Sequence, residues 1–572
     1  MMTKQTFPSY DALLANYKLD VPPDFNFVYD VIDVIAAEEP QRRAMIHVGP
    51  HGETREFNFA WFAEQSARLA HALKKRGVKK GDRIMLVLYR SVEFWVCMLA
   101  LHRIGAVAIP APAQLTVKDI VFRASYGKLA GIICEDTITE RVEAARKEYT
   151  AWNIFIQTRS PGQSGPSDAP LCCKAAPLPA DWLDYTTLFA EGGPTMAKPA
   201  RPELAAGEDP LLIFFSSGTT GMPKMVQQSH TYPLGHYITG AYWHDIEDDD
   251  LHLTLADTGW GKAVWGKLYG QWMQRGTVFV WDFRGKFEPA ALLRVLAEHH
   301  VTTFCAPPTV YRYLVREDLA SYDLSSLRYC TTAGELLNDS VFEDWQRITG
   351  LPIYEGFGQT ESTLMIATFK CMTPKPGSIG RPVPGWNVIL LNTENQLCQP
   401  GEEGEICVRF EKGKPPVGLF QGYVGDAELT AKVLSDTLYR TGDKAWMDED
   451  GFFWFLGRVD DLIKSSGYRI GPFEVESALV SHPAVIEAAV TGVPDPVRGQ
   501  AVKATVVLAQ GFIPSDELTR ELQNHVKQVT APYKYPRILE YVKELPKTIS
   551  GKIRRAEIRA RDQGEEFKTG AD

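Results

Sequence analysis

Residues 216–224 read SSGTTGMPK and follow the apolar run LLIFF at residues 211–215. The run has the length and composition of a buried strand, so we expect a loop at the end of that strand. The loop holds two glycines and four hydroxyl residues, and Lys224 adds a positive charge. Backbone N–H groups and hydroxyls in such a loop can surround phosphate oxygens, which indicates a nucleotide phosphate site.

Two other interpretations of this stretch were considered. The phosphate loop of P-loop NTPases requires G-x-x-x-x-G-K-[ST], whereas here Gly221 is followed by Met222, Pro223 and Lys224, so that motif does not match. A plain surface connection remains an alternative, because loops of serine, glycine and threonine are common. Further motifs along the chain favour the nucleotide interpretation.

The composition limits the class of protein. A chain of 572 residues with 45% hydrophobic and 23% charged residues is typical of a globular protein of two or three domains. A net charge of -10 argues against a general nucleic-acid binder, and no apolar run is long enough to span a membrane. The N-terminus lacks the pattern of a secretory signal, and nine scattered cysteines without C-x-x-C argue against zinc or disulfide frameworks. We therefore expect a cytoplasmic location.

The order of helical and strand-like patterns predicts an α/β fold. Helix and strand patterns alternate over residues 59–110 and again over 289–306, which favours layered α/β sheets with mostly parallel strands. The segment 158–202 is rich in Pro, Gly, Ser and Ala, so we expect an irregular surface excursion there.

Two further regions differ from this α/β part in their sequence patterns. Short glycine-punctuated segments over residues 378–457 predict β-hairpins, and therefore a small β subdomain. The remainder predicts a small α+β domain, and the boundary is expected near Asp460. The predicted domains are thus 1–459, a large N-terminal domain, and 460–572, a mobile C-terminal domain.

Two motifs of the large domain suggest contacts with a nucleotide. The segment YEGFGQTE at 354–361 follows an apolar stub and is expected to form a glycine-rich turn, where Glu361 can bind magnesium. The segment YRTGD at 439–443 is expected to place Asp443 after a tight turn, where it can accept hydrogen bonds from ribose hydroxyls. The alternative for Asp443 is a turn residue that bonds its own backbone.

Three charged segments follow. GRVDD at 457–461 places Arg458 beside two carboxylates, SSGYR at 465–469 predicts a flexible loop, and PKTISGK at 546–552 presents Lys552 on a mobile turn. Residues 531–561 carry nine Lys or Arg against three Glu. A surface that meets phosphates and a solvated basic tail are both compatible with this charge.

The stretches SSGTTGMPK, YEGFGQTE, YRTGD and PKTISGK, with GRVDDLIKSSGYRIG between the last two, resemble the adenylate-forming (AMP-binding) enzymes. That superfamily includes acyl-CoA synthetases, luciferases and the adenylation domains of peptide synthetases. The resemblance covers about residues 30–560. The segments ADTGW at 256–260 and SSGYRIGPFEVE at 465–476 look most like medium-chain acyl-CoA synthetases.

The resemblance implies an ATP-dependent carboxylic acid:CoA ligase. Such an enzyme joins the acid to AMP with release of pyrophosphate and then transfers the acyl group to the thiol of coenzyme A. ATP, Mg²⁺ and coenzyme A are the expected co-substrates and cofactor. The C-terminal domain would rotate about a hinge at Asp460 between the two half-reactions.

The resemblance also implies roles for residues at the matching positions. Thr360 would meet the α-phosphate, Glu361 would bind magnesium, and Lys552 would bridge the α-phosphate and the carboxylate. Asp443 and Arg458 would hold the ribose. The β- and γ-phosphates would be held by Ser216, Ser217, Gly218, Thr219, Thr220, Gly221 and Lys224. The adenine would be flanked by Gly334, Glu335, Glu355, Gly356 and Phe357.

Coenzyme A and the acid have their own expected contacts. The loop of Ser465, Ser466 and Gly467 would approach the acyl-adenylate, and the candidates for the phosphates of coenzyme A are Arg469, Arg498 and Lys534. The acyl pocket is expected at Trp243, Trp260, Lys262, Trp265, Cys305 and Gly358. Gly358 should leave a deeper slot than acetate requires, and the tryptophans should limit its length. We expect small to medium acids, including branched or aromatic ones; ordinary core packing is the alternative for each tryptophan.

Two other functions remain open. A stand-alone adenylation enzyme that loads a carrier protein, or a luciferase-type enzyme, uses the same activation step. A non-catalytic nucleotide sensor would not need Lys552. The chain ends 20 residues after Lys552, which leaves no room for a carrier domain and favours free coenzyme A as the acceptor. The expected partners are the small-molecule acid, ATP and coenzyme A, and a homodimer is compatible with the sequence.

Overall fold

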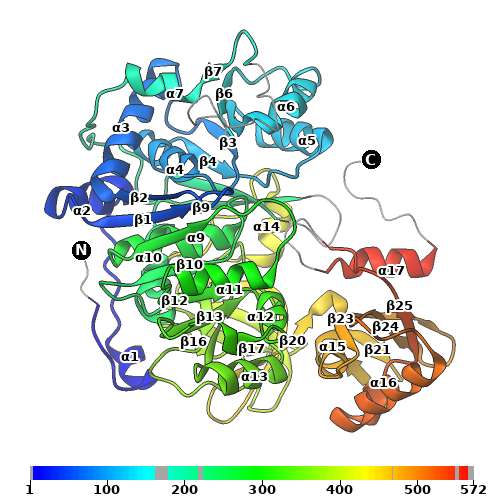
Figure 1. The fold of residues 1–572 in the computed structure, drawn as a ribbon. Helices are drawn as coiled ribbons and strands as arrows, with labels where there is room; N and C mark the ends of the chain where they lie inside the picture. The colour runs from blue at the N-terminus through cyan, green and yellow to red at the C-terminus, as the bar shows by residue number, and fades with distance from the viewer. Residues whose placement is uncertain (1–3, 161–177, 217–222, 467, 548–552, 565–572) are drawn as a thin grey trace.

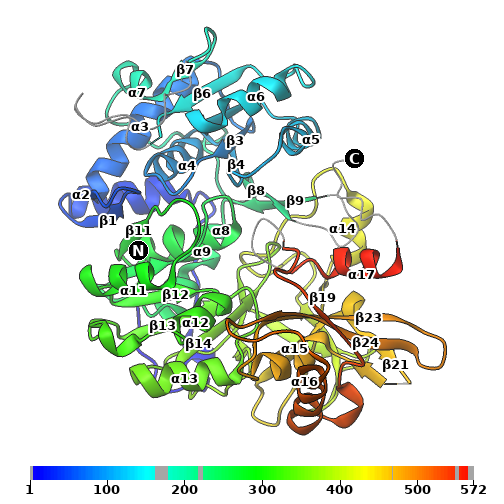
Figure 2. The same cartoon turned by 45° about the vertical axis from the view of Figure 1, so that its right-hand side comes forward.

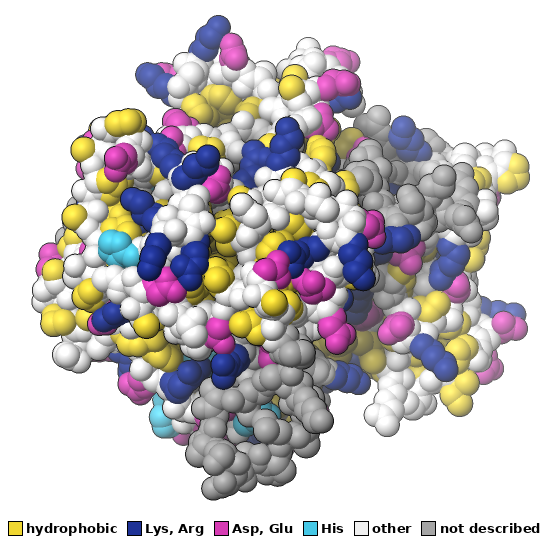
Figure 3. Space-filling model, turned by 90° about the horizontal axis from the view of Figure 1, so that it is seen from above, with side chains coloured by type: hydrophobic (Ala, Val, Ile, Leu, Met, Phe, Trp, Pro, Cys, Tyr) yellow, Lys and Arg dark blue, Asp and Glu magenta, His cyan; other side chains and the backbone are white. Residues whose placement is uncertain are grey.

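The computed structural model describes residues 4–160, 178–216, 223–466, 468–547 and 553–564. Over these residues, two large sheets and one small sheet form the body of the molecule, and a fourth sheet lies in a smaller C-terminal body (Figure 1). Positive and negative side chains are interspersed over the face seen in Figure 3, so this face presents no continuous surface of one sign.

The larger sheet has the strand order β16-β15-β14-β13-β12-β10-β11-β1-β2. The strands from β14 to β1 are parallel to one another, β2 pairs antiparallel with β1 at one edge, and β15 pairs antiparallel with both β14 and the edge strand β16. The strands are β1 Arg43–Val48, β2 Thr54–Asn58, β10 Leu251–Thr254, β11 Thr277–Trp281, β12 Thr303–Ala306, β13 Tyr329–Ala333, β14 Ile353–Gly358, β15 Leu364–Ala367 and β16 Arg381–Pro382.

The second large sheet has the order β7-β6-β5-β3-β4-β8-β9 and is parallel except for β9. Its strands are β3 Arg83–Val87, β4 Val107–Pro110, β5 Gly131–Glu135, β6 Ile154–Thr158, β7 Leu183–Asp184, β8 Pro210–Ser216 and β9 Lys224–Ser229. The predicted layered α/β architecture with mostly parallel strands is confirmed. The apolar run before the phosphate loop is β8, and β9 returns antiparallel beside it.

Alternation along the strands divides the core into layers. Ile84 of β3 packs in the central layer between the two large sheets, together with α3 (Phe59–Lys75) and α4 (Glu93–Ile104). Its neighbour Met85 faces the outer layer with α5 (Val117–Gly127) and α6 (Thr139–Arg146). Ile46 of β1 belongs to a third cluster, on the other face of the nine-stranded sheet, with α11 (Pro289–Glu298), α12 (Pro308–Leu314) and α13 (Asp339–Thr349). Each of the two large sheets is therefore covered by helices on both faces, as parallel sheets require.

The helices α3, α4 and α11 lie in the segments 59–110 and 289–306, where the sequence predicts helical patterns. Asn58 caps the first turn of α3, since its side chain accepts from the Trp61 N–H at 2.8 Å. The long helices are α3 Phe59–Lys75, α4 Glu93–Ile104, α5 Val117–Gly127, α6 Thr139–Arg146, α11 Pro289–Glu298 and α13 Asp339–Thr349. The shorter ones are α1 Tyr10–Asn16, α2 Asp33–Glu38, α7 Tyr185–Leu188, α8 Tyr232–Gly235, α9 Gly261–Lys267, α10 Tyr269–Met273, α12 Pro308–Leu314 and α14 Ala427–Val433.

Single turns of other helix types complete the body: the π-type turns η1 Val28–Ile32 and η4 Thr239–Trp243, and the 3₁₀ turns η2 Asp136–Ile138, η3 Phe189–Glu191 and η5 Leu319–Ser321. The segment 158–202 is more regular than expected, because β7, α7 and η3 lie within it; residues 161–177 fall outside the described chain. No helix in the part of the chain that the structure describes is both long and apolar enough to span a bilayer.

The predicted β subdomain is an antiparallel sheet of β17 Asn387–Leu391, β18 Gly404–Arg409, β19 Leu438–Met447 and β20 Phe453–Arg458. Two turn predictions are wrong. YEGFG is not a turn but the strand β14, and YRTGD lies inside β19 rather than after a turn. Gly442 has φ +71 at an irregularity in the β18–β19 register, so glycine there produces a bulge within a continuous strand.

The C-terminal body contains β21 Ile463–Ser465, β22 Tyr468–Ile470, β23 Val485–Asp495, β24 Gly499–Leu508 and β25 Ile538–Tyr541. Its helices are α15 Pro472–Val480, α16 Asp516–Val529 and α17 Arg555–Gln563, with the 3₁₀ turns η6 Val459–Asp461 and η7 Pro532–Lys534. It lies beside α12 of the body (Figure 2), where Arg316 Nη2 donates to the Val485 carbonyl at 2.8 Å. Asp460 is exposed in η6, between the two bodies; its role as a hinge and the domain boundary there stay predictions.

Candidate active site

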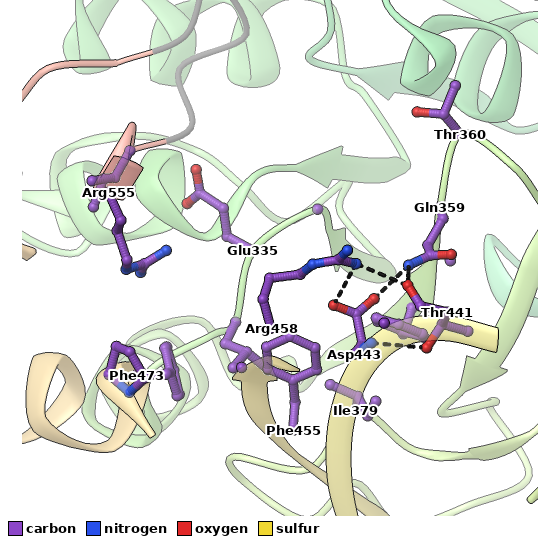
Figure 4. A pocket seen from close by; sticks show the side chains of 18 of the residues that line it. Glu335, Gln359, Thr360, Ile379, Thr441, Asp443, Phe455, Arg458, Phe473 and Arg555 are labelled. Atoms are coloured by element: carbon purple, nitrogen blue, oxygen red, sulfur yellow. Dashed lines mark hydrogen bonds and ion pairs between the residues drawn. The ribbon is translucent and has the colours of Figure 1, made fainter. Parts of the chain in front are cut away.

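A cavity of about 580 Å³ lies where the body meets the C-terminal domain (Figure 4). It is found at the carboxyl ends of β13 and β14, where open α/β sheets usually bind ligands. Eleven predicted site residues line it: Ser216, Lys224, Gly334, Glu335, Gly356, Phe357, Gly358, Thr360, Glu361, Asp443 and Arg458. The fold therefore brings four separate sequence motifs to one place.

Asp443 is held by hydrogen bonds from two sides (Figure 4). Gln359 Nε2 donates to Asp443 Oδ2 at 2.5 Å and to the Thr441 carbonyl at 3.0 Å. Arg458 Nη1 donates to the same carbonyl at 2.9 Å and to Asp443 Oδ1 at 3.2 Å. The Tyr439 hydroxyl donates to Gln359 Oε1 at 2.5 Å and fixes the orientation of the amide. The carboxylate is thus oriented at the cavity wall.

Glu361 and Lys224 meet at a second wall. The Tyr423 hydroxyl donates to Glu361 Oε1 at 2.9 Å, and Lys224 Nζ lies 5.2 Å from the centroid of the Tyr423 ring. Within the described parts of the chain, no group donates to Glu361 Oε2. Those parts contain no cluster of three or more His, Cys, Asp or Glu that could hold a metal. A single carboxylate fits Mg²⁺, because this ion commonly binds one or two carboxylates together with the phosphates of its substrate.

Thr360 follows β14 directly, at the cavity wall. Its carbonyl accepts from Gln228 Nε2 at 2.9 Å, which ties the loop after β14 to strand β9. Gln228 is fully buried. The backbone at Thr360 is therefore fixed relative to the strand that Lys224 begins.

Four of the five residues expected to flank adenine line the cavity, and their contact with adenine stays a prediction. Gly334, Glu335, Gly356 and Phe357 line the cavity, and the Phe357 ring lies 5.8 Å from Phe455. The Thr309 hydroxyl donates to Glu335 Oε2 at 2.6 Å.

Glu355, the fifth residue, does not line the cavity, and its contact with adenine also stays a prediction. Its carboxylate is buried and accepts from the Leu337 N–H at 3.4 Å. Burial raises the pKa of Glu355 well above its usual value. The residue precedes Phe357 by two positions along β14 and is covered by the start of the segment that leads into α13.

The C-terminal domain forms the opposite wall, with Phe473, Glu476, Lys547, Ile553 and Arg555. Arg555 forms a bidentate ion pair with the buried Glu476: its Nε donates to Oε1 at 3.0 Å and its Nη2 donates to Oε2 at 2.6 Å. Lys552 lies outside the described residues, but Lys547 and Ile553, which flank the segment 548–552 that contains it, both line the cavity. Ser217, Gly218, Thr219, Thr220 and Gly221 of the phosphate loop, and Gly467, also lie outside the described residues.

The acyl-pocket prediction for Gly358 needs correction. A Cβ atom at Gly358 would lie 2.3 Å from Trp265 Cη2, and one at Gly356 would lie 2.6 Å from the Trp243 ring. The space beside Gly358 is therefore not an open slot, because the Trp265 indole fills it. The Tyr232 hydroxyl accepts from Trp265 Nε1 at 3.0 Å and holds this ring in place.

The remaining acyl-pocket residues do not line the cavity. Lys262 Nζ donates to the Ala333 carbonyl at 2.7 Å. Cys305 is buried in β12, and Trp260 is partly buried at the start of α9. Trp260, Lys262 and Trp265 nevertheless share α9 and its cap, so one element carries three of the predicted positions.

The ADTGW segment joins the two large sheets. Asp257 forms an ion pair with Arg90 at 3.0 Å, and the Thr258 hydroxyl donates to the Leu88 carbonyl at 2.5 Å. Lys267 Nζ donates to the Ala256 carbonyl at 2.5 Å. Burial lowers the pKa of Lys267 to about 7, and the charge of Arg90 adds to the effect. A buried charged layer thus connects the loop of α9 to the end of β3.

Four of the residues expected to meet coenzyme A lie on the C-terminal domain and do not line the cavity: Ser465, Ser466, Arg498 and Lys534. The Ser466 N–H donates to the Arg498 carbonyl at 2.9 Å, and Ser465 pairs with Gly499 across two strands. Lys534 forms an ion pair with Glu474. The backbone of Arg469 pairs with Lys464 in the β21–β22 hairpin. Ser466 and Arg498 are brought together, and Lys534 lies apart from them in η7; their contact with coenzyme A stays a prediction.

Several residues of the site were not foreseen, among them Gln359, Tyr423 and Arg555. Gln359 stands inside the YEGFGQTE motif, so its position was visible but its bond to Asp443, 84 positions away, was not. Tyr423 carries no motif signal of its own. Arg555 was counted only as one of nine basic residues in the tail, and its pairing with Glu476 depends on the fold.

Comparison with known proteins agrees with this geometry. The family of AMP-binding enzymes matches residues 32–424, and the C-terminal domain of AMP-binding enzymes matches residues 474–552. The chain is 39% identical to acyl-coenzyme A synthetase ACSM3, mitochondrial, of Homo sapiens, over 98% of this chain and 93% of that protein. It is 40% identical to acyl-coenzyme A synthetase ACSM5, mitochondrial, of Homo sapiens, over 95% of this chain and 92% of that protein.

A solved structure of the anthranilate CoA ligase AuaEII with anthranoyl-AMP superimposes with a TM-score of 0.84 at 27% identity, over 95% of this chain and 98% of that one. The structure of a benzoate CoA ligase from Burkholderia xenovorans LB400 superimposes with a TM-score of 0.76 at 26% identity, over 94% of this chain and 100% of that one. These matches cover both bodies of the molecule. The chain belongs to the family of AMP-binding enzymes.

Proposed function

We propose that this protein is an AMP-forming carboxylic acid:CoA ligase that activates its acid in the cavity between the body and the C-terminal domain. One observation carries the proposal. Glu361, Asp443 and Arg458 of the body meet, at one cavity, the C-terminal residues on both sides of the segment that contains Lys552. A cavity built by two domains in this way suits a reaction in which one domain supplies the nucleotide site and the other a movable cation.

The chemistry follows from the poor leaving group of a carboxylate. The carboxylate oxygen attacks the α-phosphorus of ATP, an O–P bond forms, and the bond to the β-phosphate breaks as pyrophosphate leaves. The thiol of coenzyme A, as thiolate, then attacks the acyl carbon of the mixed anhydride and expels AMP. Both steps concentrate negative charge on phosphate and carbonyl oxygens, which preplaced cations and N–H donors stabilise.

The residues of the cavity have the chemistry for these tasks. Asp443 and Arg458 would hold the ribose, and Lys224 and Thr360 would bind phosphate oxygens. Glu361 would hold Mg²⁺, which neutralises phosphate charge when bound. Lys552 would supply a positive charge between the α-phosphate and the attacking carboxylate. These roles are part of the proposal.

The preferred acid is proposed to be compact: small to medium in length, and branched or aromatic. Trp265 supports this, because its ring occupies the space beside Gly358 where a long chain would have to extend. The printed names of two structural relatives, an anthranilate CoA ligase and a benzoate CoA ligase, also refer to compact aromatic acids.

A panel of acids tests the proposal. Straight acids of two to twelve carbons, branched acids and benzoates are assayed with ATP and coenzyme A, and pyrophosphate and thioester are measured separately. Both products are expected, with the highest kcat/KM for a compact acid. Pyrophosphate and adenylate without thioester would identify an enzyme that loads a carrier protein instead. No pyrophosphate with any acid would favour a nucleotide sensor.

The location in the cell and a homodimeric state are also proposals. Seven cysteines in the described chain are free thiols, which suits a reducing compartment such as the cytoplasm. The vertebrate relatives named above carry "mitochondrial" in their names, and the mitochondrial matrix is reducing as well. Fractionation of cells that express the full chain distinguishes the two compartments, and sedimentation tests the dimer.

A further inference from the structure

Tyr423 lies between two charged residues of the cavity. Its hydroxyl donates to Glu361 Oε1 at 2.9 Å, and Lys224 Nζ lies 5.2 Å from the centroid of its ring. The residue is only 7% exposed, yet it lines the cavity together with both partners. One side chain therefore contacts both the carboxylate and the cation of this wall.

The backbone around Tyr423 is tied to the same two elements. Tyr423 forms a β-bridge with Val226, and the Val424 N–H donates to the Met225 carbonyl at 2.9 Å, so the segment lies along β9. The Phe420 N–H donates to the Glu361 carbonyl at 2.7 Å. The position of the phenol is thus fixed relative to the strand that Lys224 begins and to the loop that carries Glu361.

A glutamate side chain at the wall of an open cavity can rotate about its terminal bonds. The phenol restricts this rotation by occupying Oε1, which leaves Oε2 without a donor among the residues that the structure describes. A phenol carries its proton at neutral pH, so the Tyr423 hydroxyl acts as the donor in this hydrogen bond. The arrangement preorganises one carboxylate oxygen for a cation.

We propose that Tyr423 is a positioning residue for the metal–nucleotide complex. Its hydroxyl orients Glu361 so that Oε2 is available to Mg²⁺, and its ring holds the ammonium group of Lys224. The inference rests on the proposed function through the role of Glu361 as metal ligand. It adds a residue that contacts neither the metal nor the reacting atoms but decides how well the metal ligand is placed.

Equilibrium binding of a non-hydrolysable ATP analogue is measured once with Mg²⁺ and once with EDTA. The Kd in EDTA divided by the Kd with Mg²⁺ is the ratio that reports metal-assisted binding. We expect Tyr423→Phe to lower this ratio about tenfold, as for loss of one hydrogen bond to a charged group, while the retained ring leaves binding in EDTA unchanged. Mn²⁺ binding in the presence of the analogue, measured by electron paramagnetic resonance, should weaken in parallel.

A double-mutant cycle separates positioning from a general structural effect. If Tyr423 acts through Glu361, Tyr423→Phe should have no further effect in the Glu361→Gln background. Tyr126→Phe is the matched control: the Tyr126 hydroxyl lies 3.5 Å from where a Cβ at Gly425 would be, next to the same segment but not at the cavity. This variant should keep the wild-type ratio.

Different results refute different claims. The inference about Tyr423 is wrong if Glu361→Gln lowers the ratio and Tyr423→Phe does not. It is also wrong if the free-energy effects of the two single variants add in full in the double variant. If Glu361→Gln itself leaves the ratio unchanged, the proposed metal ligand is wrong, and the failure belongs to the proposed function.

Discussion

Replacement of Trp265 by alanine tests how the enzyme limits its acid. Trp265 is 7% exposed, and its Cη2 atom lies 2.3 Å from where a Cβ at Gly358 would be. Removing the indole should therefore open the slot that the sequence predicted beside Gly358. Acids with longer chains should gain activity relative to short ones.

The structure sets the expected loss of stability and the expected gain in kcat/KM for longer acids. Loss of a buried tryptophan destabilises a protein by about 3–5 kcal/mol, and here it also removes the donor to the Tyr232 hydroxyl. Each methylene that the acid buries in the new space is worth about 0.8 kcal/mol, which is roughly fourfold in kcat/KM. A chain extended by two carbons should thus gain about 15-fold over the short acid.

The assay is thioester formation over a series of straight-chain acids, with the free energy of unfolding measured in urea. Trp272→Ala is the matched control, because Trp272 is fully buried and donates to the Ala44 carbonyl but does not contact Gly358. The control should lose similar stability and keep the wild-type chain-length profile. An unchanged profile in Trp265→Ala, or the same change in both variants, would refute this account of the acyl pocket.

Two further predictions concern charge. Gln359→Glu places a second carboxylate against Asp443, so ATP affinity measured by calorimetry should fall about 30-fold; a change below threefold would contradict the role of the amide. Lys267 has a pKa near 7 in the folded protein against 10.5 in the unfolded chain, so the unfolded state binds more protons between these values. Its contribution to stability should rise with pH across that window, by up to about 1.4 kcal/mol per pH unit. Lys267→Met should remove that slope in urea unfolding at pH 7.5 and 9, and an unchanged slope would refute it.

Much of the fold could be predicted because its signals are local. The alternation of helix and strand patterns at 59–110 matches α3, β3, α4 and β4, and strand faces follow from the period of two. The glycine-rich segment at 354–358 was predicted wrongly as a turn, and so was a tight turn before Asp443 in the segment 439–443, which contains Gly442. Glycine is a turn signal, but pairing with neighbouring strands overrides it in β14 and in the bulged β19.

The site was predictable where a motif carries its residues and not where contacts join distant positions. Glu361, Asp443 and Arg458 belong to motifs, and all three line the cavity. Glu355 belongs to the same motif as Glu361 but is buried, because its place along the strand decides its surroundings. The filling of the slot at Gly358 by Trp265 depends on packing between residues 93 positions apart, which no local pattern reveals.

The most direct test of the central claim measures the two half-reactions of Lys552→Ala. If the C-terminal lysine serves activation at this cavity, acid-dependent pyrophosphate release from ATP should be lost, while thioester formation from a supplied acyl-adenylate and coenzyme A should continue near the wild-type rate. Equal loss of both half-reactions, or pyrophosphate release at the wild-type rate, would contradict it.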